Sequence, residues 1–446
     1  MNVIDEKSFM LSQSGFLRVI QLAIPLIIGN ISVPLLGVID TAVVGHLHES
    51  YDISAIGLGT TVFDFLFWAF SFLRFSTTGL IAQAKGRQDN QEMHIVVIQA
   101  LGFAILLGFI SVALQQPLAR LIFYLLRDNS PQIIIHTAAF FHVGIWVAPI
   151  EMLTYVIIGV FIGLQQTRKI LYLVLITTLL AAPLDVLFVN GLHLGAAGIA
   201  YAYILATAIS FCVGLIWLFQ VTELHRFKWQ INKFFRLYTL KRIMVLNLNI
   251  FIRTICLLWV FTFFTTQGAR FGSIILSANV VLMNFQNIMA YAADGFANVA
   301  ETLVGETIGE RNKQHFYRVL GYTGICSIAV GVFFCLVYLG FGRYFIEALT
   351  SIPGVRIAAR TYLSWSALLS LVSVWSFWLD GIFMGATKGA ILRNAMIIAV
   401  VLFMVVWWMT QAWHNQGLWF SLILFMMFRT LTLGIPLLKW LKQLRW

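Results

Sequence analysis

Residues 80–91, LIAQAKGRQDNQ, return with substitutions as residues 303–314, LVGETIGERNKQ, 223 positions further along the chain. A second pair of stretches, GVFIG at 159–163 and GIFMG at 381–385, repeats at an offset of 222. Each match alone is weak, but both agree on an offset of half the 446-residue chain. The sequence therefore predicts two related halves, each built from the same series of elements.

The composition indicates that both halves lie in a membrane. Hydrophobic residues make up 60% of the chain and charged residues 11%, whereas soluble proteins average about 25% charged residues. The net charge of +11 does not indicate nucleic-acid binding, because the basic residues lie between the apolar runs rather than on one amphipathic face. We expect a polytopic membrane protein in contact with lipid, without a nucleic-acid partner.

Twelve apolar runs are long enough to cross a bilayer, which takes about 20 helical residues. They lie near 16–45, 53–82, 93–116, 132–164, 169–190, 194–220, 243–268, 274–305, 317–340, 358–386, 391–411 and 417–438. Both repeated motifs recur six runs later, and an even offset relates the halves by an axis along the membrane normal. We expect an all-α protein with an N-lobe over 1–220, a cytoplasmic linker over 221–242 and a C-lobe over 243–446.

The distribution of Lys and Arg predicts the orientation. The N-terminus, the even-numbered loops and the C-terminus together hold 20 of these residues, and the opposite side holds 6. Cytoplasmic loops carry the excess of positive charge in membrane proteins. Both termini and the linker are therefore expected in the cytoplasm.

Asp40 lies inside the first apolar run, LAIPLIIGNISVPLLGVIDTAVVGH at 22–46. An ionised Asp in hydrocarbon costs about 3 kcal/mol or more, so it normally faces a bundle interior or a water-filled cavity. The run also contains four residues that weaken a helix, Pro25, Gly29, Pro34 and Gly37. We expect this span to be bent or locally unwound around a transport pathway.

Asp185 lies at the outer end of the fifth run, as Asp40 does in the first, about 8 Å below the outer surface if each residue rises 1.5 Å. Two carboxyl groups at one depth in one lobe can share a proton or bind a cation. The alternative is that each acid contacts outer water independently.

Two acids of the second half, Asp294 and Asp380, lie nearer the inner side. Three aromatic residues, Trp378 among them, lie within the five positions before Asp380. Acids beside aromatic rings are typical of a pocket for lipophilic cations, although packed or lipid-facing rings would give the same pattern. Arg253 and Asn284 are further candidates for this substrate cavity.

Asp64 and Glu151 lie in the middle of spans, and each is either functional or a neutral, hydrogen-bonded carboxyl group. Arg74 and Arg253 either pair with the acids or extend toward the inner surface, and we favour the second interpretation.

The sequence contains none of the motifs GxxxxGK[ST], GxSxG and HExxH, and its nine histidines lack metal-ligand spacing. We therefore expect neither an enzyme nor a metal or other cofactor.

Four stretches of the sequence resemble a known family. They are PLIIGNISVPLLGVIDTAVVGHL at 25–47, LRFSTTGLIAQAKG at 73–86, AYAADGFANVAE at 290–301 and LDGIFMGATKGAILRN at 379–394. They are similar to multidrug and toxic compound extrusion (MATE) transporters, and most similar to the DinF-type branch. The resemblance runs from the first span to beyond the tenth.

The resemblance implies two six-helix lobes and efflux of amphipathic, often cationic, compounds in exchange for H+ or Na+. It makes Asp40 the ion-coupling carboxylate and Asp185 its partner. Pro25, at the bend of the first span, Asn30 and Tyr203 would be neighbours of the coupling site.

This chain departs from the family pattern at two positions near the acids. Ala181 stands where the family usually has Asn, and Tyr203 follows the stretch that usually ends in Thr. A Na+ ion needs several oxygen ligands, whereas a proton needs only a suitable carboxyl group. We therefore expect H+ as the coupling ion, with Na+ as the alternative.

The predicted function is that of a monomeric antiporter in the bacterial inner membrane that exports small amphipathic or cationic molecules by alternating access. The alternative is a flippase for lipid-linked oligosaccharides of related two-lobe architecture. Such a flippase is expected to have a strongly basic cavity, whereas the deep charges here are mostly acidic.

Overall fold

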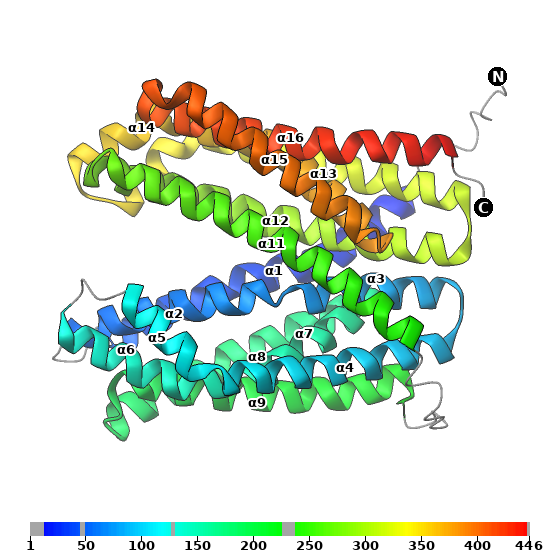
Figure 1. The fold of residues 1–446 in the computed structure, drawn as a ribbon, viewed down its shortest axis with the longest axis horizontal. Coiled ribbons are helices and arrows are strands. Elements are labelled where there is room, and N and C mark those ends of the chain that lie inside the picture. Colours follow the sequence, from blue (N-terminus) through cyan, green and yellow to red (C-terminus); the bar gives the residue numbers. More distant parts are fainter. Residues whose placement is uncertain (1–12, 45–49, 126–129, 225–236, 444–446) are drawn as a thin grey trace. The chain divides into compact units, whose positions relative to one another are not determined.

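The computed structural model describes residues 13–44, 50–125, 130–224 and 237–443. Within these ranges every regular element is a helix, which confirms the predicted fold class (Figure 1). The elements of the first half are α1 (Gln13–Val44), α2 (Ser50–Ala69), α3 (Phe72–Gly86), α4 (Asn90–Ala113), α5 (Gln115–Leu125), α6 (Pro131–Gly144), η2 (Ile145–Val147), α7 (Ala148–Gly163), α8 (Thr167–Val186), η3 (Leu187–Gly191) and α9 (Gly195–Thr222). Those of the second half are α11 (Leu237–Arg270), α12 (Ser273–Glu310), α13 (Lys313–Leu349), α14 (Pro353–Gly385), α15 (Gly389–Thr410), η5 (Gln411–Trp413) and α16 (His414–Gln443).

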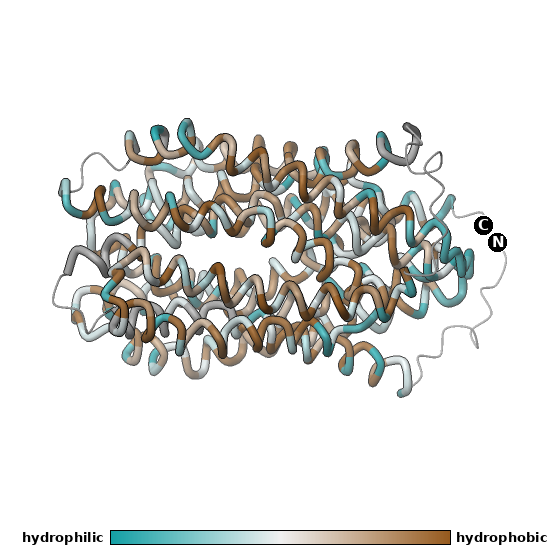
Figure 2. The backbone as a smooth tube through the Cα atoms, turned by 90° about the horizontal axis from the view of Figure 1, so that it is seen from below, coloured by the Kyte–Doolittle hydropathy of each residue, from teal (hydrophilic) through white to brown (hydrophobic). Residues whose placement is uncertain are grey.

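Among the described residues, 11 stretches are long and apolar enough to cross a membrane. The last of them, Gly389–Gln443, contains α15 and α16, which pack against each other, so it accounts for the last two predicted spans. Figure 2 shows hydrophobic residues along the middle of most helices and hydrophilic ones toward many helix ends. These features establish a multi-pass membrane protein.

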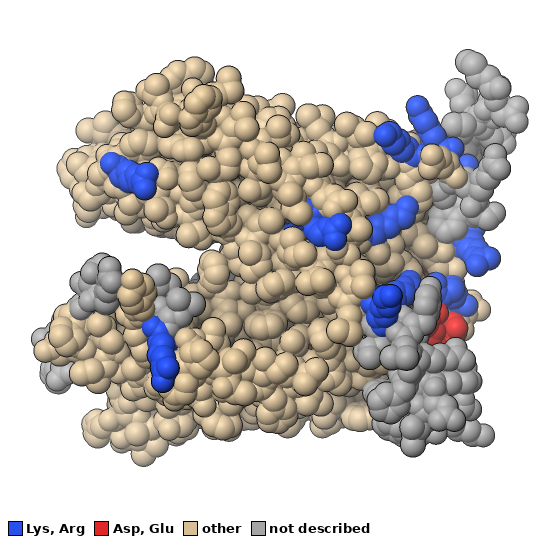
Figure 3. Space-filling view, viewed as in Figure 1, with Lys and Arg blue, Asp and Glu red and all other residues tan. Residues whose placement is uncertain are grey.

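Apolar side chains on the outside of the helices fit the same conclusion. Phe109 and Trp408 are 61% and 72% exposed, and on a membrane protein lipid covers such surfaces. The face in Figure 3 is mostly uncharged, with Lys and Arg confined to a few places. The backbone polar groups along these surfaces are satisfied inside the helices, as a bilayer requires.

Three features differ from the sequence-based expectation. The second predicted span is two helices, α2 and α3, separated at Phe70 and Ser71. A short helix, α5, lies where a loop was expected, and it carries Pro117 in its first turn, where a helix tolerates proline. α1 is helical throughout Gln13–Val44, so the predicted local unwinding is wrong, while a bend remains a prediction.

The chain falls into two compact units. One comprises 1–27, 82–88 and 244–446, and the other 28–81 and 89–243. Two short segments of the first half thus belong to the unit that contains the second half. The lobes over 1–220 and 243–446 remain a prediction, and residues 225–236 of the proposed linker lie outside the described residues.

Helix ends confirm the internal repeat. Gln88 and Arg311, 223 positions apart, both adopt a left-handed backbone, with φ of 56° and 53°. Asp89 and Asn312 follow them, and each side chain accepts a hydrogen bond from the backbone N–H three residues later, at 2.9 and 3.0 Å. Because a side-chain acceptor at this position satisfies a free helix donor, both copies start their next helix in the same way.

Small residues make the same helix contact in each half. Gly159 and Gly163 of α7 lie against the Arg74 and Thr78 carbonyls of α3. Glycines spaced by four residues let two helix backbones approach closely, which is a common mode of packing in membranes. In the other unit, the equivalent α14 glycines Gly381 and Gly385 lie against the α12 carbonyls of Ala297 and Glu301.

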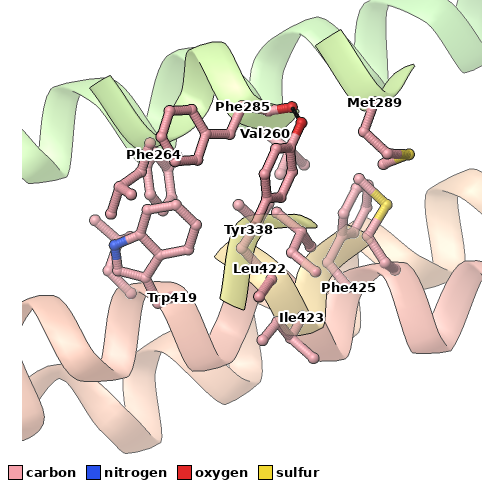
Figure 4. Packing of buried hydrophobic residues seen from close by; sticks show 14 of the residues in the cluster. Val260, Phe264, Phe285, Met289, Tyr338, Trp419, Leu422, Ile423 and Phe425 are labelled. Atoms are coloured by element: carbon pink, nitrogen blue, oxygen red, sulfur yellow. Dashed lines mark hydrogen bonds between the residues drawn. The ribbon is translucent and has the colours of Figure 1, made fainter. Parts of the chain in front are cut away.

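An aromatic cluster lies in the core of the unit that comprises 1–27, 82–88 and 244–446, which we call the C-terminal unit (Figure 4). The Tyr338 hydroxyl donates to the Phe285 carbonyl at 2.5 Å, and their rings stack with centroids 4.9 Å apart. Phe264 and Trp419 meet edge to face at 5.1 Å. The rings join α11, α12, α13 and α16 within this unit.

Candidate functional site

Asp185 is almost fully buried, with 1% of its surface exposed, in the last turn of α8. Pro183 lies inside this turn, and a wider π-helical turn, η3, follows it. Since π turns and proline both disturb regular helix hydrogen bonding, the acid lies beside an irregular stretch of a membrane-spanning helix.

The predicted partner, Asp40, belongs to α1, but its side chain lies outside the described residues. Its pairing with Asp185 therefore stays a prediction. Pro25 and Asn30 also belong to α1, where Pro25 is buried and Asn30 is half-buried. Ala181, one turn before Asp185 on α8, is 1% exposed and contributes only a methyl group.

Tyr203 of α9 donates its hydroxyl hydrogen to Glu151 of α7, at 3.5 Å. Tyr155, one turn further along α7, interacts electrostatically with Glu151, Asp64 and Arg74. α7 and α9, which are separated in the chain by α8, thus bring a carboxyl group and two tyrosines together. The role predicted for Tyr203 beside Asp185 remains untested by this geometry.

Asp380 of α14 is held by two arginines. Arg253 of α11 and Arg429 of α16 both donate to its Oδ2 atom, the latter at 2.7 Å. The exposed fractions of Asp380, Arg253 and Arg429 are 4%, 7% and 1%. Arg253 therefore pairs with an acid, and the expectation that it extends to the inner surface is wrong.

Arg429 is the residue of this network that the sequence interpretation missed. It also interacts with Asp294 of α12 and lies near the rings of Phe377 and Phe425, 6.0 and 5.7 Å from their centroids. Two arginines and two acids together carry no net formal charge, which reduces the cost of burial. An Arg in the middle of the last apolar run was the signal that could have revealed it.

The structure gives other contacts for Trp378 and the exposure of Asn284, the two remaining cavity candidates. The indole Nε1 of Trp378 donates to the Thr323 hydroxyl of α13 at 3.0 Å, and its ring lies against Gly324. Asn284 is exposed on α12. Asp380, Arg253 and Asp294 are thus brought together, while Trp378 and Asn284 are not seen to join them.

A second charged cluster surrounds Glu306 of α12, which is 8% exposed. Arg18 of α1 and Lys85 of α3 pair with its two carboxylate oxygens at 3.2 and 3.0 Å. Gly86 lies against the Glu306 carbonyl, and its repeat counterpart Gly309 lies against the Gln83 carbonyl. Helix ends from both halves of the sequence are therefore joined here by ion pairs and by backbone contact.

The MatE family model matches residues 25–187 and 250–409, once in each half of the chain. The chain is 34% identical to DNA damage-inducible protein F of Escherichia coli (strain K12), with 93% of this chain and 90% of that protein covered. It is 25% identical to the probable multidrug resistance protein NorM of Acinetobacter baylyi, with 90% of each covered.

Two solved structures share the fold. One is an outward-facing multidrug resistance MATE family transporter of the MOP superfamily, with a TM-score of 0.84, 17% identity, and 96% of this chain and 97% of that chain covered. The other is the MATE transporter VcmN of Vibrio cholerae in a bent form, with a TM-score of 0.84, 17% identity and coverages of 96% and 98%.

Proposed function

Because this chain belongs to the MatE family of membrane transporters, we propose that it exports amphipathic, often cationic, compounds in exchange for H+. It is a transporter and not an enzyme, and its relatives include multidrug resistance proteins. The proposed location is the bacterial inner membrane, with both termini in the cytoplasm and a monomer as the working unit.

The observation that carries the proposal is the burial of Asp185 in a membrane-spanning helix. An ionised carboxylate in hydrocarbon costs several kcal/mol, whereas its protonated form costs much less. A carboxyl group at this place therefore favours different arrangements of the surrounding helices in its two protonation states. This is the property that coupling to a proton gradient requires.

The neighbours of Asp185 support H+ rather than Na+. Ala181 offers no oxygen one turn before the acid, and the Tyr203 hydroxyl hydrogen-bonds to Glu151. A bound Na+ needs several oxygen ligands around it, but a proton needs a single carboxyl oxygen. The side-chain oxygen usual at position 181 is thus missing, and the hydroxyl of Tyr203 is already hydrogen-bonded to another residue.

In the proposed cycle a proton enters from outside and binds to the Asp40 and Asp185 pair. Neutralising the pair removes the charge that repelled the carboxyl groups from each other, so α1 repacks and substrate leaves outward. Reopening to the inside then releases the proton. A membrane potential of about 100 mV adds roughly 2.3 kcal/mol for each charge that crosses.

Alternating access is supported by relatives and by the repeat. Solved relatives are described as outward-facing and as a bent form, so the fold occurs in more than one conformation. Two halves with equivalent helix contacts are the arrangement in which one half can move against the other.

Transport assays in proteoliposomes test this function. With an imposed pH gradient in sodium-free buffer, the purified protein should drive efflux of a fluorescent amphipathic cation such as ethidium. A requirement for Na+ with no response to the pH gradient would contradict H+ coupling. Transport of lipid-linked sugars without cation efflux would favour the flippase alternative.

A further inference from the structure

Glu151 is a half-buried acid that the Asp40 and Asp185 mechanism does not use. It lies in the first turn of α7, directly after the short 3-10 turn η2 that ends α6. Its carboxylate accepts the hydrogen bond from Tyr203 on α9. A carboxyl group within a membrane-spanning segment is expensive unless it is partnered or serves transport.

Three helices converge on this acid. α2, α7 and α9 each contact the other two, and they contribute Asp64, Glu151 and Tyr203. Both Tyr203 and Tyr155 interact electrostatically with Glu151 and Asp64, and Tyr155 also interacts with Arg74. The cluster therefore holds two carboxyl groups, one guanidinium group and two phenol groups inside one unit.

A helix break accompanies the cluster. α2 ends at Ala69 and α3 begins at Phe72, so the break falls between Asp64 and Arg74. Ser71 in this break is 5% exposed, and its hydroxyl has no hydrogen-bond partner among the described residues. Broken membrane helices with free polar groups are typical of sites for coupling ions.

α4 and α8 also pack on α7. On α4, His94 contacts the Thr222 carbonyl at 2.5 Å, and Glu92 pairs with Arg242 at 3.7 Å. α8 contributes Asp185, a second acid in the same unit. Arg74 interacts electrostatically with Tyr155 and so brings a guanidinium group to the cluster.

We propose that Glu151 is a second proton-binding residue of the transport cycle, positioned by Tyr203. A proton forms an O–H bond at a Glu151 carboxylate oxygen in one conformation, and the same bond breaks in the other. Protonation leaves the contact between α7 and α9 without a net charge, which lowers the cost of rearranging these helices in lipid. This inference rests on the proposed H+ coupling.

The number of protons exchanged per substrate tests the proposal, because a residue that only supports the fold would not change it. In proteoliposomes, the pH gradient that just balances an opposing substrate gradient gives this number. Glu151→Gln should lower it by one and keep substrate counterflow. Glu347→Gln is the matched control, since Glu347 is an exposed acid on α13 that pairs with Arg360, and it should leave the number unchanged.

Two further variants distinguish the loss of a proton-binding group from a folding defect. Glu151→Asp keeps a carboxyl group and should keep the wild-type proton number. Tyr203→Phe removes the donor and should slow gradient-driven efflux about tenfold, the effect of about 1.4 kcal/mol, without changing the number. If Glu151→Gln exchanges as many protons as the wild type, the inference is wrong while H+ coupling stands. If the wild type itself ignores the pH gradient, the proposed function fails and this inference fails with it.

Discussion

Arg429 of α16 donates a hydrogen bond to the Asp380 carboxylate of α14 across 2.7 Å, and both side chains are buried. Arg253 binds the same carboxylate oxygen from α11. A single acid thus joins three helices of the C-terminal unit. Such a network is costly to disrupt, because removing one member leaves an opposite charge buried without compensation.

Asp380→Asn should therefore destabilise the protein strongly, by about 3 to 5 kcal/mol, because it leaves two buried guanidinium groups facing a neutral amide. Arg429→Met should cost less, since Arg253 still pairs with Asp380. The melting temperatures of both variants are measured by thermal unfolding in detergent, monitored by size-exclusion chromatography. The control is Glu347→Gln at the exposed pair with Arg360, worth about 0.2 to 1 kcal/mol. Equal melting temperatures for Asp380→Asn and this control would contradict the structural role.

Asp40→Asn should abolish efflux driven by a pH gradient while the protein still folds and inserts. Asparagine has the shape of a protonated carboxyl group but cannot release a proton. Asp185→Asn should be similarly severe, because its burial makes its protonation state matter to the surrounding helices. Asp64→Asn, at an exposed position on α2, should be milder. Normal gradient-driven efflux by Asp40→Asn would refute its assignment as the coupling residue.

Glu306→Gln should lower stability modestly, by about 1 kcal/mol, because it removes the charge that pairs with Arg18 and Lys85. The partners are 47% and 32% exposed, so water screens both ion pairs. Glu310→Gln is the matched control on the same helix, where the carboxylate contacts His315 at an exposed position. Melting temperatures at low and high salt should differ more for the wild type than for Glu306→Gln.

Gly381→Ala should destabilise by about 1 to 3 kcal/mol, because the added methyl group would collide with the Ala297 carbonyl on α12. Gly159→Ala, the equivalent change on α7, should act in the same direction against Arg74. At Gly340 of α13 the space is open, so Gly340→Ala should be neutral or stabilise by about 0.5 to 1 kcal/mol. Opposite signs at Gly381 and Gly340 in thermal unfolding would confirm the glycine contact, and equal effects would contradict it.

The membrane-spanning helices and the duplication were predictable from the sequence alone. Hydrophobic runs of spanning length leave a helix as the form that satisfies the backbone in lipid. The offset shared by the two pairs of repeated motifs predicted the repeat. The contacts of the glycine pair with α3 and α12 follow from the small size of glycine. Asp40 and Asp185 were also visible, because an acid in an apolar run is rare enough to stand out.

Only the tertiary structure decided which charges meet. Asp380, Arg253 and Arg429 are separated by up to 176 positions in the chain, counted from 253 to 429, yet they share one hydrogen-bonding centre. The hydrophobic pattern determines that a helix forms, but lipid and protein are equally apolar surroundings for most of its side chains. Which polar face of one helix meets which face of another therefore depends on close packing across the unit. Likewise, packing of α7 against α9 brings the Tyr203 hydroxyl to Glu151, a contact that the sequence did not predict.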